Sequence, residues 1–225
     1  MSNNYKKGGG DKLQPYISKG NGEESGQYTE GEIVDNYLVS ESCTKSDLLN
    51  VLSEEEAASV NEYTKIEIGK ALNKAIREGT MTESDVKLKD LIISAISKHK
   101  LKSAADVFRG ITVSREVYER CFLIQYLLDL PIEGSLICST SRIFSRAVSA
   151  AKTKSDDDVG VVFCGELPKG YNALPIEGIS NNAAEKEILI TAPYYQIEEI
   201  TNCVWNGLKF KRIKVKILGD KNHEN

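Results

Sequence analysis

The apolar residues of this sequence change their period near residue 105. Before that point, apolar side chains recur three and four positions apart, which is typical of the buried side of an amphipathic helix. Beyond it, short runs of β-branched and aromatic residues alternate with turn residues, which favours strands. Because a helical half precedes a strand-rich half, with no regular alternation of the two, the pattern predicts an α+β fold.

Capping signals divide the helical half. A short helix is expected in SDLLNVL (46–52). Ser53, with Glu56 three residues later, predicts the start of a helical stretch that closes at Gly79, as one long helix or as two end to end. Thr82 predicts the start of a further helix, with basic residues at its C-terminal end.

The second half mixes strands with two helices. Helices are expected in SREVYERCFLIQYLLDL (114–130), which stops at Pro131, and in SRIFSRAVSAAK (141–152). An acidic loop, SDDDVG, follows the second helix. The expected strands are DVFRGITV (106–113), GSLICST (134–140), VGVVFCGEL (159–167), YNALPIE (171–177), EKEILI (185–190), YYQIEEI (194–200) and LKFKRIKVKIL (208–218).

Composition predicts one domain with a tail. Residues 1–42 are rich in Gly, Ser, Asn, Lys and Glu without sustained periodicity, so we expect a flexible tail followed by a single domain over 43–225. Apolar residues make up 40% of the chain, yet no run of 18 could span a bilayer, so no membrane association is expected. The net charge of −4 gives no reason to expect direct nucleic-acid binding. The N-terminus lacks the apolar core of a signal peptide, which favours synthesis in the cytoplasm.

Two enzyme classes are disfavoured by the residue inventory. The chain has two histidines, His99 and His223, so neither a histidine-based metal site nor a Ser-His-Asp triad is easily assembled, and no metal is expected. Five cysteines lie without short paired spacings, which favours free, buried thiols. They are Cys43, Cys121, Cys138, Cys164 and Cys203.

Two glutamates stand one residue apart where an apolar run begins, in AAEKEILI (183–190). On a regular strand, Glu185 and Glu187 would share a face and crowd two carboxylates together. Crowding raises one carboxylate's pKa, as at sites that manage protons or positive charge. A solvated strand edge is the alternative.

Three short elements occur in a recognisable order: Arg109 on one strand, Ser139-Thr140-Ser141 leaving a second, and Glu-Lys-Glu entering a third. This order resembles the arginine, Ser-Thr-Ser, Glu-x-Glu signature of mono-ADP-ribosyltransferases of the cholera and clostridial toxin class. NEYTKIEIGKALNKAIREG (61–79) resembles the family's N-terminal helix, and ELPKGYNALPIEGISNNAAEKEILI (166–190) its stretch before the catalytic glutamate. The resemblance covers roughly residues 53–218. It implies N-terminal helices packed on two mixed antiparallel sheets around an NAD cleft.

The resemblance assigns three catalytic roles. Cleavage between nicotinamide and ribose leaves an oxocarbenium-like sugar, and a carboxylate stabilises such a cation. Glu187 takes this role and holds the ribose 2′-hydroxyl, while Ser139 holds the Glu187 rotamer. Glu185 orients an acceptor guanidinium and takes up its proton. A branch with Gln at this position modifies Asn, so Glu185 favours arginine.

Other positions are implied to bind NAD. Arg109 would contact the diphosphate, with a surface ion pair as the alternative, and Gly110 would let the backbone approach the nicotinamide amide. Arg77 and Asn73, on one helix face, would reach the phosphates or adenosine, and solvated polar positions are the alternative. Thr140 and Ser141 are further cofactor-binding candidates, with capping of the helix 141–152 as the alternative. Tyr63 would stack on adenine or, as the residue type favours, pack in the core.

The resemblance also implies where the protein acts and on what. The loop 175–184 corresponds to the family's target-recognition turn, where this chain offers Ile176 and Ile179 in place of the usual aromatic residue. The expected activity transfers ADP-ribose from NAD to a protein arginine, as a toxin, an injected effector or a phage enzyme. It would act in the cytosol of a host or infected cell, where it is made or after delivery by a secretion machine. NAD hydrolysis and a non-catalytic protein-binding module are the alternatives.

Overall fold

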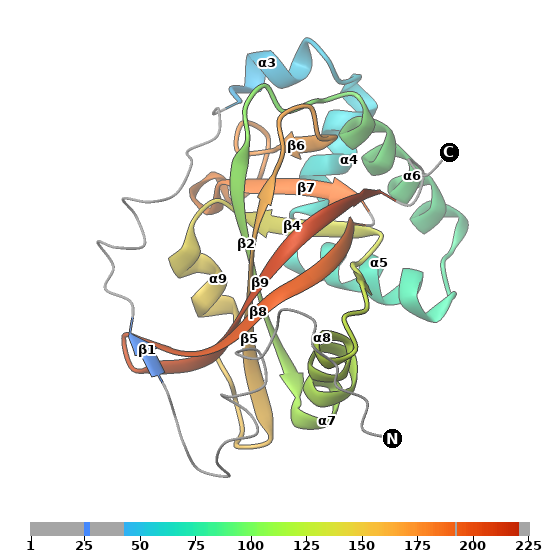
Figure 1. Ribbon diagram of the computed structural model, residues 1–225. Helices are drawn as coiled ribbons and strands as arrows, with labels where there is room; N and C mark the ends of the chain where they lie inside the picture. Colours follow the sequence, from blue (N-terminus) through green and yellow to red (C-terminus); the bar gives the residue numbers. More distant parts are fainter. Residues whose placement is uncertain (1–24, 28–42, 192, 221–225) are drawn as a thin grey trace, which may run out of the picture.

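The structure, a computed structural model, describes residues 25–27, 43–191 and 193–220 (Figure 1). Its centre is a twisted, mixed β-sheet with helices on both faces. Within the described residues the strands run in the order β1-β8-β9-β5-β2-β4-β7-β6, with β3 beside β8. Their bounds are β1 Ser25–Gln27, β2 Ala105–Ser114, β3 Ile132–Glu133, β4 Ile137–Ser141, β5 Asp158–Leu167, β6 Ala173–Pro175, β7 Glu187–Thr191, β8 Pro193–Trp205 and β9 Leu208–Asp220.

The sheet consists of two halves that meet at β2 and β4. One half is built on the long β8–β9 hairpin and on β5 paired with the full length of β2, and the other is β4, β7 and β6. A single residue pair, Phe108 with Ser141, joins the halves. The two expected sheets are therefore parts of one hydrogen-bonded path that nearly separates at this junction, and the α+β architecture is confirmed.

Four N-terminal helices cover the β4-β7-β6 half, on the right and at the top of Figure 1. They are α3 Lys45–Leu49, α4 Glu54–Tyr63, α5 Ile66–Glu78 and α6 Glu83–Ser97. The stretch 53–79 is thus two helices. Ser53 and Thr82 form the expected capping boxes, and Gly79 closes α5 with φ 66°. Apolar side chains of these helices form one core with the sheet, including Val60, Leu72, Ile92, Ile96, Ile137 and Leu189.

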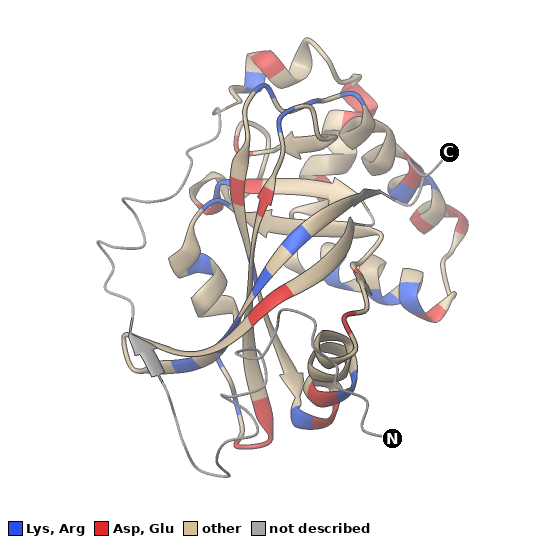
Figure 2. Cartoon of the chain, in the orientation of Figure 1, with Lys and Arg blue, Asp and Glu red and all other residues tan. Residues whose placement is uncertain are grey.

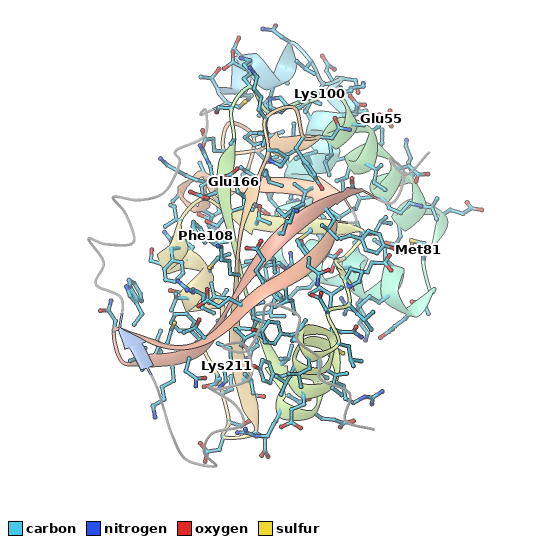
Figure 3. All side chains as sticks on the ribbon, in the orientation of Figure 1. Glu55, Met81, Lys100, Phe108, Glu166 and Lys211 are labelled. Carbon is cyan, nitrogen blue, oxygen red and sulfur yellow. The ribbon has the colours of Figure 1, made fainter. Side chains whose placement is uncertain are left out.

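The other half of the sheet is covered by the segment α7 Arg115–Tyr118, a π-helical turn Glu119–Leu123 and α8 Ile124–Leu127. The expected helix there is confirmed, with a π-helical turn that the sequence pattern does not announce. Helix α9, Phe144–Ala150, lies on the opposite side against β2. Phe108, labelled in Figure 3, meets Phe144 edge to face at 5.4 Å between ring centroids.

Part of the expected tail belongs to the sheet, because β1 pairs in parallel with residues 202–204 of β8. The rest of 1–42 lies outside the described residues. All five cysteines are free, and three are buried; Cys121 is exposed and Cys164 half-buried. No helix in the described part is long and apolar enough to cross a bilayer. Acidic and basic residues are interspersed over the face shown in Figure 2, with basic positions along β9 beside acidic ones on β8.

Candidate functional site

A pocket of about 450 Å³ opens where the two halves of the sheet meet. Strands β2, β4 and β7 and helix α9 contribute its walls. Seven of the residues singled out from the sequence line it: Arg109, Gly110, Ser139, Thr140, Ser141, Glu185 and Glu187. Three strands that are distant in sequence, with the turn that precedes the third, thus bring the arginine, the Ser-Thr-Ser run and both glutamates to one cavity.

Glu187 is the buried carboxylate of this pocket. It begins β7, pairs with Ser141 of β4, and is 8% exposed. Ser139, two residue pairs further along the same ladder, donates its hydroxyl to Glu187 Oε1. Burial raises the pKa of Glu187, the hydrogen bond from Ser139 opposes that rise, and the neighbouring Glu185 adds to it. β7 lies between β4 and β6, so this glutamate is not on a solvated edge.

Glu185 does not lie on the strand, contrary to the expected shared face of a regular strand. It ends a 3₁₀ turn, Ala183–Glu185, and Lys186 then adopts a left-handed conformation with φ 44° before β7 starts. This turn still leaves both carboxylates at the pocket. Asn182 donates its side-chain amide to Glu185 Oε1 at 2.6 Å, and the Glu185 carbonyl accepts from the Ser141 hydroxyl at 2.7 Å.

Arg109 is partly buried between β2 and β4. One terminal nitrogen of its guanidinium donates to the Ser139 carbonyl at 2.7 Å and contacts the Cys138 sulfur at 3.2 Å. Arg109 therefore fixes the backbone that carries Ser139 and is not part of a surface ion pair. Gly110 is required by packing as well, because a Cβ there would lie 1.7 Å from the Ala147 carbonyl oxygen of α9.

Thr140 and Ser141 do not cap α9. The residue before that helix is Ile143, which makes no capping side-chain bond. The Thr140 hydroxyl donates to the Ile188 carbonyl at 2.9 Å. The Ser141 hydroxyl donates to the Glu185 carbonyl and accepts from the Ile143 backbone amide. Both hydroxyls therefore secure the strand and the loop that hold the glutamates.

Asn73 and Arg77 are not among the residues that line the pocket. Asn73 donates to the Tyr63 hydroxyl at 2.9 Å, while Arg77 is exposed near the end of α5. Tyr63 packs in the core, as expected, and burial raises its pKa to about 12. Asn73 therefore holds the hydroxyl of a core tyrosine.

The loop before β7 does not present its isoleucines. Ile176 and Ile179 are buried in the core shared with α4. The expectation that they stand in for the aromatic recognition residue is therefore wrong, because neither side chain is exposed. The exposed positions of this loop are residues 181–184 and Lys186. The pattern failed here because two apolar residues three apart are compatible with either role.

Two functional candidates were missed from the sequence, one that lines the pocket and one that binds the Glu185 carboxylate. Arg146 of α9 lines the cavity and adds a second guanidinium to it. The signal was available, because Arg146, Ser149 and Ala150 share one face of the expected helix. Asn182, the partner of the Glu185 carboxylate, had no such signal. Across the described residues, no group of three or more His, Cys, Asp or Glu could hold a metal ion.

Comparisons with known proteins give structural matches alone. No protein-family model matches the sequence, and no curated protein matches it. The fold is similar to Plx2a, an ADP-ribosyltransferase toxin from Paenibacillus larvae, with a TM-score of 0.64 and 21% identity over 78% of this chain and 91% of that one. It is also similar to C3stau2 from S. aureus, solved with NAD, with a TM-score of 0.60 and 14% identity over 81% and 100%.

A third match spans part of a longer chain. The enzymatic component C2-I of the C2 toxin from Clostridium botulinum has a TM-score of 0.60 and 20% identity, and the match covers 79% of this chain and 46% of that one. Identities of 14–21% are too low to carry residue roles by themselves, but the shared topology is extensive. The chain has the fold of the bacterial ADP-ribosyltransferase toxins.

Proposed function

We propose that this chain is an NAD-dependent mono-ADP-ribosyltransferase that attaches ADP-ribose to a protein arginine and releases nicotinamide. The observation that carries the proposal is the pair of carboxylates at one pocket, one buried and held by Ser139, the other on a loop at the rim. C3stau2, which shares the fold, was solved with NAD, and a C. perfringens toxin component, BECa, with NADH. Both support NAD as the co-substrate.

The buried carboxylate suits the bond-breaking step. When the bond between nicotinamide and ribose C1′ breaks, its electron pair leaves with neutral nicotinamide and positive charge develops on the sugar. A buried Glu187 stabilises that charge more strongly than an exposed carboxylate could, because water does not screen it. The Ser139 hydroxyl fixes the carboxylate and opposes the effect of burial, which favours the neutral acid.

Two guanidinium groups suit the diphosphate. Arg109 on β2 and Arg146 on α9 both line the pocket. Guanidinium binds phosphate oxygens through paired N–H donors, so the two could hold the NAD diphosphate and orient the nicotinamide toward Gly110. Asn73 and Arg77 remain proposals for the adenosine end.

The second carboxylate suits an arginine acceptor. A guanidinium that attacks C1′ must lose a proton, and Glu185 lies at the rim of the same pocket, within reach of a side chain entering from solvent. Its carboxylate would orient the guanidinium by charge and accept the proton. Attack by water in place of the guanidinium would give NAD hydrolysis. The observation that favours this second activity is the partial exposure of Glu185, because water can reach the pocket there.

The test separates these activities. The intact chain is incubated with NAD labelled in the ADP-ribose moiety, with agmatine as a small guanidino acceptor and with a cell lysate. Arginine transfer predicts labelled agmatine and labelled arginine peptides by mass spectrometry, and E187Q should abolish both transfer and nicotinamide release. Free ADP-ribose without labelled acceptor would favour the hydrolase, and an unchanged E187Q would overturn the catalytic assignment.

A further inference from the structure

The loop that carries Glu185 is fastened to helix α4 by a group of side chains that the proposed chemistry does not use. Asn61, near the end of α4, donates its side-chain amide to the Ile179 carbonyl at 2.6 Å. In return, Asn181 donates to the Asn61 carbonyl at 2.9 Å. Thr64, the C-cap of α4, accepts from the backbone and side-chain amides of Asn181 at 3.1 and 3.0 Å. We call Asn61, Thr64 and Asn181 the α4 clamp.

The clamp is one residue away from the group that orients Glu185. Asn182 follows Asn181 directly, and its side-chain amide donates to Glu185 Oε1 at 2.6 Å. The carbonyl of Asn182 also accepts from the Glu185 amide at 3.0 Å, which closes the 3₁₀ turn. The position of Asn182, and with it the direction of the Glu185 carboxylate, therefore depends on where Asn181 is held.

Glu187 is held by different means. It belongs to β7, which is paired on one side with β4 and on the other with β6, and Ser139 of β4 is its hydrogen-bond partner. The beginning of the loop is secured apart from the clamp as well, by the buried ion pair of Arg142 with Glu177 and by the buried Ile176. Loosening the clamp should therefore leave the pocket and Glu187 intact.

We propose that the α4 clamp positions Glu185 and so sets how the ADP-ribosyl group is divided between a guanidino acceptor and water; this inference rests on the function proposed above. In both reactions the C1′–nicotinamide bond breaks and nicotinamide leaves with the electron pair. With a guanidinium, the new bond is C1′–N and the displaced proton passes to Glu185. With water, the new bond is C1′–O and the proton passes to solvent. A displaced Glu185 impairs the first path and spares the second.

The test uses variants of the full chain that remove hydrogen bonds with little change in shape. T64V removes the hydroxyl that accepts from Asn181, and T64S keeps it. N181A cuts the clamp at an exposed loop position, where loss of folding is not expected. E62Q, on the exposed side of the same helix where Glu62 pairs with Lys65, is the matched control. For each variant, total nicotinamide release and labelled agmatine are measured in the same reaction.

T64V and N181A should lower the ratio of agmatine label to nicotinamide release by about tenfold or more, because displacing a reacting group by an ångström can cost about 100-fold. Nicotinamide release and the KM for NAD should stay near wild type, and T64S and E62Q should keep the wild-type ratio. A loss of both activities in equal proportion, or an unchanged ratio in N181A, would overturn the clamp while leaving the transferase intact. A wild-type chain that labels no agmatine would overturn both proposals.

Discussion

Replacing Ser139 with alanine should make NAD cleavage more sensitive to acid. The substitution removes the hydroxyl that donates to Glu187 and leaves a carboxylate that is 8% exposed and close to Glu185. Burial already raises the pKa of Glu187, and the Ser139 hydrogen bond is the largest effect that opposes the rise. Without it the pKa rises further, and the ionised form, which stabilises the sugar cation in the proposed function, is lost at a higher pH.

The size of the effect follows from the bond that is removed. A hydrogen bond to a charged group contributes about 1.5–3 kcal/mol, which corresponds to about 10- to 100-fold in the ionised fraction where the neutral acid predominates. S139A should therefore cleave NAD about 10- to 100-fold more slowly than the wild type on the acid side of the profile, with a smaller deficit as pH rises.

The assay is nicotinamide release, with kcat/KM measured from pH 5 to 9 for the wild type, S139A and S149A. S149A is the control, because Ser149 lines the same pocket but donates to the Ser145 carbonyl of its own helix. A profile of S139A that coincides with the wild type would refute the reasoning. A deficit of equal size at every pH would show that Ser139 orients Glu187 without affecting its ionisation.

Three further predictions follow from the same contacts. Arg146→Ala should raise the KM for NAD by about tenfold, with Arg146→Lys intermediate, if its guanidinium binds a phosphate; equal KM values in steady-state kinetics would exclude that role. Gly110→Ala should destabilise the fold by about 1–3 kcal/mol in chemical denaturation, because its Cβ would overlap the Ala147 carbonyl, and a stability equal to wild type would contradict this packing. Burial opposes ionisation of Glu56, but hydrogen bonds from Lys98, Ser53 and Ser94 outweigh it and lower its pKa from 4.5 to about 2, so its contribution to stability is full above pH 4.5 and is lost as pH falls toward 2. Glu56→Gln should therefore flatten the pH dependence of the unfolding free energy in that window, and an unchanged slope would contradict the assignment.

The helices could be predicted because their signals are local. Ser53 and Thr82 each satisfy amides of the first turn that follows, and Gly79 permits the left-handed closure, whatever the rest of the chain does. Strand pairing carries no such signal. Nothing in the sequence around Ser139 or Glu187 states that β4 and β7 are neighbours, and their convergence was expected only through the resemblance to a family.

The position of Glu185 could not be predicted for a different reason. An alternating pattern assumes an extended backbone, and the left-handed Lys186 breaks it at a residue type that rarely adopts φ 44°. The prediction for Ile176 and Ile179 failed for a similar reason. Their burial depends on contact with α4, which lies more than a hundred residues earlier in the chain. Both errors fall on a loop whose shape is set by contacts with residues distant in sequence.

The two carboxylates therefore depend on different parts of the fold. Glu187 belongs to the paired strands, so it cannot move without breaking the ladder of β4 and β7. Glu185 is held by side chains of a surface loop and by the end of α4, so its position can change while the pocket persists. On the function proposed here, cleavage of NAD is tied to the core and the choice of acceptor to the rim. A substitution in the loop can then alter which nucleophile attacks. The substitutions that abolish NAD cleavage are expected instead at strand residues such as Ser139 and Glu187.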